Sequence, residues 1–215
     1  MKHITFYLDF ISPYAYLAFE KLPEALMGLS YTVSYKPVLL GALLQHHGQL
    51  GPAEIENKRA WTYRHVEWLG HSQQVELQMP AVHPFNPLPL LRLSVACADL
   101  NPGEPNRYVC ETLFHHVWRG GADVLDATRL QALDARLSPH ADPQSEAVKA
   151  QLKQQTDEAI AASVFGVPAF RVDDKLFWGF DALPMLRDYL MGDAWFDGPN
   201  WSKSTEIPAG LLRKR

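Results

Sequence analysis

Apolar and polar positions alternate at the start of the chain. The apolar members are Ile4, Phe6, Leu8 and Phe10, and the residues between them are Thr5, Tyr7 and Asp9. A period of two is the signature of a β-strand. After Ser12 the apolar spacing changes to three and four residues, which predicts a helix through about Leu26.

The junction between this strand and this helix carries the sequence Ser12-Pro13. Ser12 is expected at the N-cap and Pro13 at the first helical position, where its missing N–H costs nothing. A hydroxyl at the positive end of a helix dipole favours an anion or a thiolate as ligand. Ser-Pro is also a common helix start, so a purely structural cap is the alternative.

A second junction lies far downstream, at Gly166-Val167-Pro168. A polar helical stretch ends at Gly166, and a strand-like segment, Ala169–Val172, follows Pro168. Because proline cannot donate to a strand ladder, Pro168 is expected at a loop or strand edge. A cis bond before Pro168 is compatible with this position and would leave the backbone of Val167 available to a ligand.

The remaining pattern completes an α/β protein. A strand is predicted over Tyr31–Val38. A further strand over Lys175–Trp178 is predicted to form a hairpin with Ala169–Val172 through the turn Asp173-Asp174. The predicted helices are Glu54–Gln73, Pro89–Ala98, Arg107–Trp118, Ala127–Leu137, Pro143–Ser163 and Ala182–Leu190. The order is βαβ, a helical insertion, then ββα. We therefore expect one discontinuous domain over residues 1–42 and 164–192, an insertion domain over 43–163, and a C-terminal tail over 193–215 whose aromatic side chains pack.

Composition fits a protein with an ordinary hydrophobic core, since 47% of the 215 residues are hydrophobic and 20% are charged. The 20 basic residues are outnumbered by 24 acidic ones, giving a net charge of −4. That balance argues against nucleic acid as the main partner. The basic run Arg213–Arg215 is expected to be a solvated tail.

No run of about 18 or more apolar residues is present, so neither a membrane span nor a membrane partner is expected. The N-terminus enters a strand without the regions of a signal peptide, which predicts a cytoplasmic protein. Cys97 and Cys110 flank the turn-rich segment Asn101–Asn106. A disulfide between them is conceivable, but two reduced, packed thiols are expected in that compartment.

Three stretches together resemble a known family. They are Phe6–Tyr14, Phe165–Pro168 and Phe177–Asp181. Their order resembles the thioredoxin fold with the helical insertion of the DsbA-like branch. Redox members of that branch have Cys-x-x-Cys where this chain has Ser12-Pro-Tyr-Ala15, so thiol–disulfide exchange at this position is excluded. The serine version resembles the glutathione-dependent group of 2-hydroxychromene-2-carboxylate isomerases and kappa-class glutathione transferases, and the isomerases are the closer likeness.

The resemblance implies glutathione as cofactor and a role for several residues. The Ser12 hydroxyl would bond the glutathione sulfur, and the backbone of Val167 would pair with the cysteinyl unit. The γ-glutamyl end would meet the Phe180 backbone and the Asp181 carboxylate. In this family a loop after the second strand supplies a side-chain amide to glutathione. Gln49 stands there in this chain where the family has an asparagine, so this contact departs from the pattern.

Other candidate residues keep two interpretations. Asp181 also stands where it would cap the last helix. Lys58 is a candidate for a substrate carboxylate, or a solvated lysine on a helix. Asn86 is a second candidate, or a cap of the next helix. The neighbouring histidines His46-His47 and His115-His116 lack the i,i+4 spacing of a zinc helix, so no metal is expected.

The sequence therefore predicts a glutathione-dependent isomerase of the 2-hydroxychromene-2-carboxylate type, acting in aromatic compound catabolism. The thiolate of glutathione would add reversibly to the double bond of an aromatic 2-oxo acid. A kappa-like glutathione transferase is one alternative. A redox-inactive thioredoxin-like protein that binds a thiol or peptide is the other. Whether the protein is a monomer or a homodimer stays open.

Overall fold

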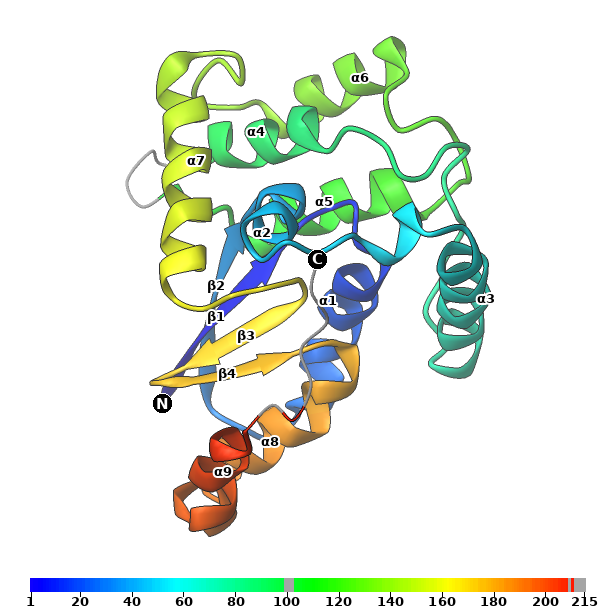
Figure 1. The fold of residues 1–215 in the computed structure, drawn as a ribbon. Coiled ribbons are helices and arrows are strands. Elements are labelled where there is room, and N and C mark those ends of the chain that lie inside the picture. Colours follow the sequence, from blue (N-terminus) through cyan, green and yellow to red (C-terminus); the bar gives the residue numbers. More distant parts are fainter. Residues whose placement is uncertain (99–102, 209, 211–215) are drawn as a thin grey trace.

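A four-stranded mixed sheet forms the centre of the computed structural model, which describes residues 1–98, 103–208 and 210 (Figure 1). The strand order is β2 (Tyr31–Pro37), β1 (Lys2–Leu8), β3 (Ala169–Val172) and β4 (Lys175–Trp178). β1 runs parallel to β2 and antiparallel to β3, and β3 runs antiparallel to β4. The predicted βαβ and ββα halves thus share one sheet.

β1 lies in the middle of this sheet and is buried on both faces. Phe6 on one face is fully buried, and Tyr7 on the other is 4% exposed. The first face packs in the main hydrophobic core with α1 (Pro13–Ala25), α5 (Arg107–Trp118) and α8 (Leu183–Met191). The second packs in a smaller core with α2 (Leu40–His46) and α7 (Glu146–Ala161). Helices on both faces are what a parallel strand pair requires.

The helices from α3 to α7 agree closely with the sequence pattern. α5 and α6 (Ala127–Leu137) have the predicted bounds, and α3 (Glu56–Ser72) and α7 lie within the predicted ranges. α4 (Leu88–Ala96) begins one residue before its predicted start and ends two residues before its predicted end. Asn106, Asp126 and Ser145 cap α5, α6 and α7 through their side chains. The domain boundaries at 42 and 164 stay a prediction, although α7 contacts β2.

α2 is a helix that the sequence pattern did not predict. Its N-cap residue, Leu39, makes no side-chain cap bond. Two distant side chains bind the backbone at its start instead: Asp9 Oδ2 accepts from Leu40 N at 2.9 Å, and Thr156 Oγ1 accepts from Leu39 N at 3.1 Å. The helix therefore starts without a local capping signal in the sequence. A short 3₁₀ turn over Pro52–Glu54 then leads into α3.

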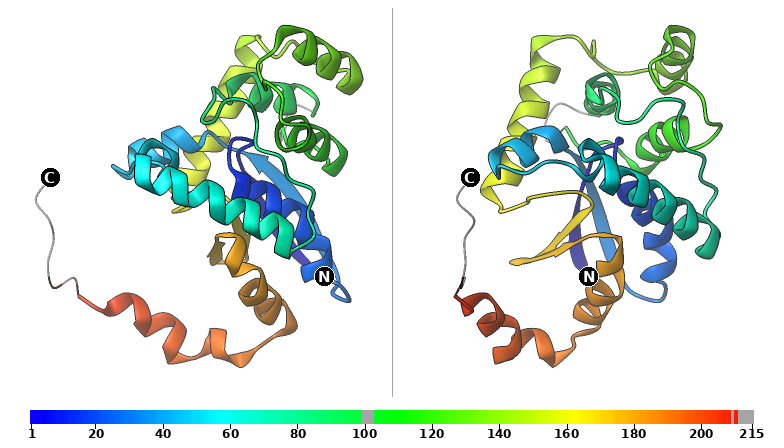
Figure 2. Two further views of the ribbon diagram at one scale, coloured as in Figure 1. Left: turned by 90° about the vertical axis from the view of Figure 1, so that its right-hand side faces the viewer. Right: turned by 45° about the vertical axis from the view of Figure 1, so that its right-hand side comes forward.

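The C-terminal segment packs its aromatic side chains, as expected. After α8 come two short 3₁₀ turns, Ala194–Asp197 and Ser204–Glu206, on either side of α9 (Pro199–Lys203). Phe196 is 5% exposed, and its ring lies 6.0 Å from Phe177 of β4. Figure 2 shows this segment leading away from α8 at one end of the molecule. The basic run 213–215 and part of the turn at 101–106 lie outside the described residues.

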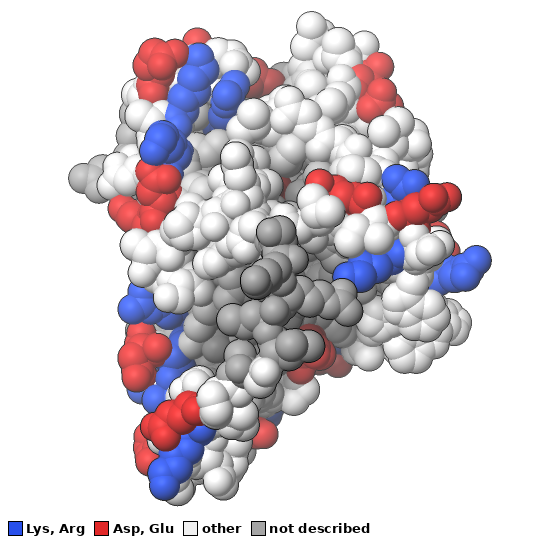
Figure 3. All heavy atoms as spheres, viewed as in Figure 1, with Lys and Arg blue, Asp and Glu red and all other residues white. Residues whose placement is uncertain are grey.

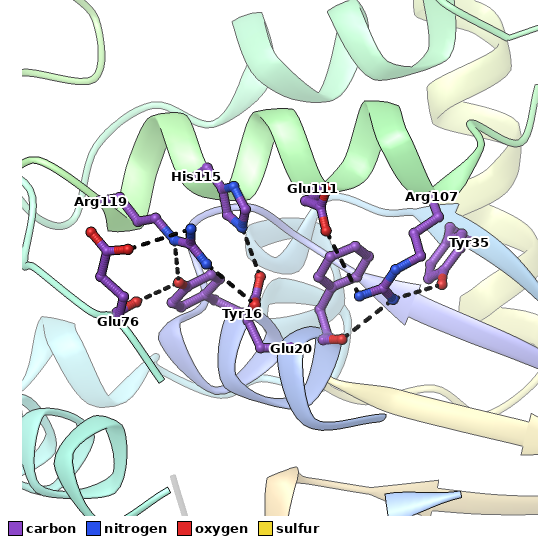
Figure 4. Close-up of polar contacts among 9 residues, drawn as sticks. Tyr16, Glu20, Tyr35, Glu76, Arg107, Glu111, His115 and Arg119 are labelled. Atoms are coloured by element: carbon purple, nitrogen blue, oxygen red, sulfur yellow. Dashed lines mark hydrogen bonds and ion pairs between the residues drawn. The ribbon is translucent and has the colours of Figure 1, made fainter. Parts of the chain in front are cut away.

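Polar contacts join α1 to α5, one of the helices between β2 and β3 (Figure 4). Glu20 of α1 accepts from His115 Nε2 at 2.8 Å and pairs with Arg119 at 3.4 Å. Oxygen and nitrogen atoms of Glu20, Glu111 and His115 lie within 4.8 Å of one another, the spacing a metal ion needs. Arg107, 4.0 Å from Glu111, and Arg119 already supply positive charge. The cluster is therefore better described as an ion-pair network.

Both cysteines are buried free thiols, so the expected reduced state is confirmed. Burial raises the pKa of Cys97 to about 11 and also raises the pKa of Cys110. Thiols with raised pKa values are poor nucleophiles at neutral pH. Neither cysteine is therefore suited to covalent chemistry.

On the face drawn in Figure 3, basic and acidic side chains are interspersed and form no broad basic surface. This agrees with the slight acidic excess of the sequence. Across the described ranges, no helix combines the length and apolar character needed to span a bilayer.

Candidate active site

Ser12 caps α1, as predicted. Its backbone is extended, with φ −88° and ψ 114°, and its Oγ accepts from Ala15 N at 3.2 Å. Pro13 occupies the first turn and has no N–H to offer. The side chain is buried, since Ser12 is only 5% exposed. The helix start thus presents one hydroxyl beside the positive end of the helix dipole.

Val167 lies against this hydroxyl, although 155 residues separate the two in sequence. The Val167–Pro168 bond is cis, the geometry that the sequence position of Pro168 allows. Ser12 Oγ donates to Val167 O at 3.4 Å, which is at the long limit of a hydrogen bond. A bond this long is weak, so the hydroxyl hydrogen is readily redirected to another acceptor.

The Gly179–Asp181 segment follows β4 and lies beside the same junction. Gly179 N donates to Pro168 O at 2.9 Å. Gly179 has φ +103°, a backbone conformation that residues with a Cβ rarely adopt, so the turn requires glycine. Phe180 packs beside Tyr14 and Leu17 of α1. The segment is thereby held against the first turn of α1.

Asp181 does not serve as a helix cap. α8 begins after Ala182, and no side chain makes a cap bond there. The Asp181 carboxylate is exposed. The pKa of Tyr14 is raised, first by the burial of Tyr14 and second by the negative charge of Asp181. The Tyr14 hydroxyl also lies 2.9 Å from His65 Nδ1 of α3. Asp181 is therefore a solvent-facing negative charge near the start of α1.

Asp9 is a residue that sequence reasoning missed. Its side chain is fully buried, and it binds the backbone of two segments: Oδ1 accepts from Ile11 N at 3.2 Å and Oδ2 from Leu40 N at 2.9 Å. Burial raises its pKa from 3.8 to about 7, although backbone N–H donors lower it in part. Asp9 thus links the turn before Ser12 to the start of α2. A charged residue three positions before Ser12 was the only local signal.

Among the described residues, no contact joins the three remaining predicted site residues to Ser12, Val167 or the Gly179–Asp181 segment. Gln49 is exposed, and its backbone N–H bonds Leu44 O at 2.8 Å. Lys58 is exposed on α3. Asn86 is exposed and lies one residue before Pro87, the N-cap of α4, which makes no side-chain cap bond. Its Oδ1 accepts from Leu88 N at 3.1 Å, so Asn86 binds the first backbone N–H of the helix without occupying the cap position. Their binding roles stay predictions.

The hydrogen-bonding and charged groups at this junction suit a small peptide that carries a thiol. Ser12 offers a hydroxyl at a helix N-terminus, Val167 offers a backbone edge beside it, and Asp181 offers a free carboxylate for an ammonium group. Glutathione contains a thiol, peptide groups and a γ-glutamyl ammonium. The residues present therefore fit it.

Comparisons with known proteins agree with this fold. Residues 3–191 match the profile of the DSBA-like thioredoxin domain. A solved structure described as SeMet 2-hydroxychromene-2-carboxylate isomerase superposes with a TM-score of 0.74 at 22% identity, covering 96% of this chain and all of that one. A probable DsbA oxidoreductase from Streptomyces coelicolor gives a TM-score of 0.61 at 13% identity, covering 99% of this chain and 94% of the other.

Sequence relatives carry two kinds of name. A 2-hydroxychromene-2-carboxylate isomerase from Sphingobium xenophagum is 29% identical over 204 residues, 88% of this chain and 98% of the relative. Glutathione S-transferase kappa 1 from Rattus norvegicus is 24% identical over 212 residues, 91% of this chain and 93% of the relative. The relatives thus include isomerases and transferases, and they align along most of the chain.

Proposed function

The chain belongs to the DSBA-like thioredoxin domain family, and from this premise we propose that it is a glutathione-dependent isomerase of the 2-hydroxychromene-2-carboxylate type. The observation that carries the proposal is the Ser12–Val167 contact, which sets a hydroxyl at a helix N-terminus beside a backbone edge. Two cysteines are absent from the position where redox members have them. The relatives named as isomerases support the reaction class.

In this proposal Ser12 is a hydrogen-bond donor and not a nucleophile. The described partners of its Oγ are Ala15 N and Val167 O, and neither is a general base. When bound, glutathione supplies a thiolate that adds reversibly to a conjugated double bond and so permits rotation about it. Ser12 and the start of α1 hold the sulfur as an anion, Val167 aligns the peptide, and Phe180 and Asp181 hold its γ-glutamyl end.

The second substrate would be an aromatic 2-oxo acid, for which Lys58 and Asn86 remain the proposed contacts. Lys58 is exposed on α3, so its ammonium group is accessible to a carboxylate. The Asn86 Oδ1 is engaged at the start of α4, which leaves its amide NH₂ to donate. Gln49 is proposed to contact glutathione from the loop after α2.

The test is a pair of measurements on the whole protein. Calorimetric titration with glutathione is expected to show binding, and an arylidene pyruvate is expected to interconvert its geometric isomers only when glutathione is present. Glutathione should be regenerated. Consumption of glutathione with an aryl halide, without isomerisation, would favour the kappa-like transferase, which the rat relative also supports. Absence of glutathione binding would contradict both enzymes and favour a thiol- or peptide-binding protein.

Asp181→Asn is expected to raise the glutathione dissociation constant at least about tenfold. A charge-assisted hydrogen bond to the ligand ammonium contributes roughly 1.5–3 kcal/mol, and 1.4 kcal/mol is tenfold. The melting temperature without ligand should barely move, because Asp181 makes no cap bond on α8. Calorimetry and thermal unfolding measure the two quantities. Asp188→Asn, another exposed carboxylate in the following helix, is the matched control. Equal affinity in wild type and Asp181→Asn would remove Asp181 from the site.

Replacing Cys97 and Cys110 together by Ala is expected to leave glutathione-dependent turnover largely intact. Both thiols are buried and their pKa values are raised by burial, so the reacting sulfur should be that of glutathione. The free energy of unfolding should fall by roughly 1–2 kcal/mol, because each substitution removes a packed sulfur. Turnover and urea unfolding check this. Lost turnover with stability and glutathione affinity retained would instead indicate a protein thiol nucleophile.

A further inference from the structure

The two carbonyl groups just before Ser12 are bound by ring N–H donors from the helical region between β2 and β3. Trp118 Nε1 of α5 donates to Phe10 O at 3.0 Å, and His83 Nε2 lies 2.9 Å from Ile11 O. The His83 and Trp118 rings also pack together, with centroids 5.6 Å apart. The turn that carries Ser12 is thus held from a part of the chain at least 70 residues away.

Tyr63 of α3 determines how His83 presents its ring. Since a carbonyl oxygen can only accept, His83 Nε2 must carry the hydrogen toward Ile11 O. In the neutral ring His83 Nδ1 is then an acceptor. The Tyr63 hydroxyl donates to His83 O at 2.8 Å and lies 2.8 Å from Nδ1 as well, so its one hydrogen is shared between these two acceptors. Burial lowers the pKa of His83, which keeps the ring neutral at neutral pH.

Both peptide planes before Ser12 are held at two ends. In the first plane Phe10 O accepts from Trp118, and Ile11 N donates to Asp9 Oδ1 at 3.2 Å. In the second plane Ile11 O meets His83, and Ser12 N donates to Asp9 O at 3.1 Å. Because a peptide unit is rigid, fixing its C=O and N–H fixes its orientation. The second plane contains the N and Cα atoms of Ser12, so holding it restricts φ of Ser12 and the directions open to its side chain.

We propose that His83, supported by Tyr63, is a positioning residue that holds the Ile11–Ser12 peptide so that the Ser12 hydroxyl points at the thiol subsite. The inference rests on the proposed function, since the thiol is that of glutathione. Hydrogen bonds weaken steeply with misalignment, so a small rotation of this peptide reduces stabilisation of the thiolate. The contacts proposed for Val167 and Asp181 lie on other segments. Loss of His83 therefore changes the thiolate more than it changes affinity.

The experiment compares His83→Phe, His83→Gln and Tyr63→Phe with wild type by ultraviolet titration of bound glutathione. His83→Phe keeps a ring but loses both nitrogen contacts, and it is expected to raise the thiolate pKa by about one unit. This is about a tenfold loss of thiolate at pH values below the wild-type pKa. His83→Gln keeps an N–H donor and should recover most of the effect. Tyr63→Phe should give a smaller rise. The glutathione dissociation constant measured below the thiol pKa should change less than about threefold.

His116→Phe is the matched control. His116 also lies in the helical region, its Nε2 is 2.9 Å from a backbone oxygen, that of Val124, and burial lowers its pKa as well. It makes no contact with the Ser12 turn among the described residues. The control should leave the thiolate pKa unchanged. An equal rise in His83→Phe and His116→Phe, or no rise in His83→Phe, would overturn the proposal.

Amide hydrogen exchange of Ser12 without glutathione separates this inference from the proposed function. Faster exchange of the Ser12 N–H in His83→Phe and Tyr63→Phe, with wild-type rates in His116→Phe, supports the positioning role even if wild type binds no glutathione. Unchanged Ser12 exchange in both variants overturns it. Should His83→Phe fail to fold, Tyr63→Phe decides by the same two readouts, because it removes only a hydroxyl.

Discussion

Ser12→Ala is expected to raise the thiolate pKa of bound glutathione by about one to two units, because a hydrogen bond to a charged group contributes roughly 1.5–3 kcal/mol. At pH values below the wild-type thiolate pKa this lowers the thiolate fraction by about tenfold to hundredfold, and turnover there should fall in proportion. Ultraviolet titration of the thiolate measures the shift. The structure supports the prediction by placing the buried Ser12 hydroxyl at the start of α1, with only a 3.4 Å contact to Val167 O to be replaced.

The same substitution also removes a helix cap, so stability must be separated from chemistry. Loss of the Ala15 N–H bond should cost about 1 kcal/mol of unfolding free energy. Ser145→Ala is the matched control, because Ser145 caps α7 by accepting from Val148 N at 3.4 Å. It should lower stability to a similar degree without moving the thiolate pKa. A wild-type thiolate pKa in Ser12→Ala would show that Ser12 is a cap and nothing more.

Much of the fold could be predicted from the sequence because its signals are local. Apolar spacing and capping residues sit within a few positions of several helix starts, as at Asn106 before α5 and Asp126 before α6. α2 was missed because its start is bound by Asp9 and Thr156, which lie on distant segments. Long-range caps leave no trace in local spacing.

The candidate site divides along the same line. Ser12, Val167 and the Gly179–Asp181 segment stand in recognisable motifs, and the structure brings them to one junction. The supporting residues were missed, because a period of two in β1 does not reveal that both its faces are buried. Asp9 then reads as a polar strand residue, although it is fully buried. His83 lies in a loop, and only the folded chain brings it to Ile11 O.

The burial of Asp9 makes stability depend on pH. The ordinary pKa of an aspartate, 3.8, applies in the unfolded chain, and the pKa of Asp9 is raised to about 7 in the folded protein, chiefly by burial. The folded state therefore keeps the proton over a range in which the unfolded state has lost it. The resulting stability is fully present below about pH 4 and is lost as pH rises through about 7. A shift of this size corresponds to roughly 4 kcal/mol.

Asp9→Asn is expected to abolish this dependence. The amide carries no charge to bury, so the variant should be more stable than wild type at about pH 8.5, where Asp9 is ionised. Near pH 4.5 it should be less stable by about 1 kcal/mol, because the amide NH₂ cannot accept the second backbone N–H. Urea unfolding across this range measures the difference. Asp126→Asn, at an exposed cap of α6, should keep the wild-type slope. An Asp9→Asn slope equal to that of wild type would mean that Asp9 is ionised throughout, with its charge balanced by the N–H groups of Ile11 and Leu40.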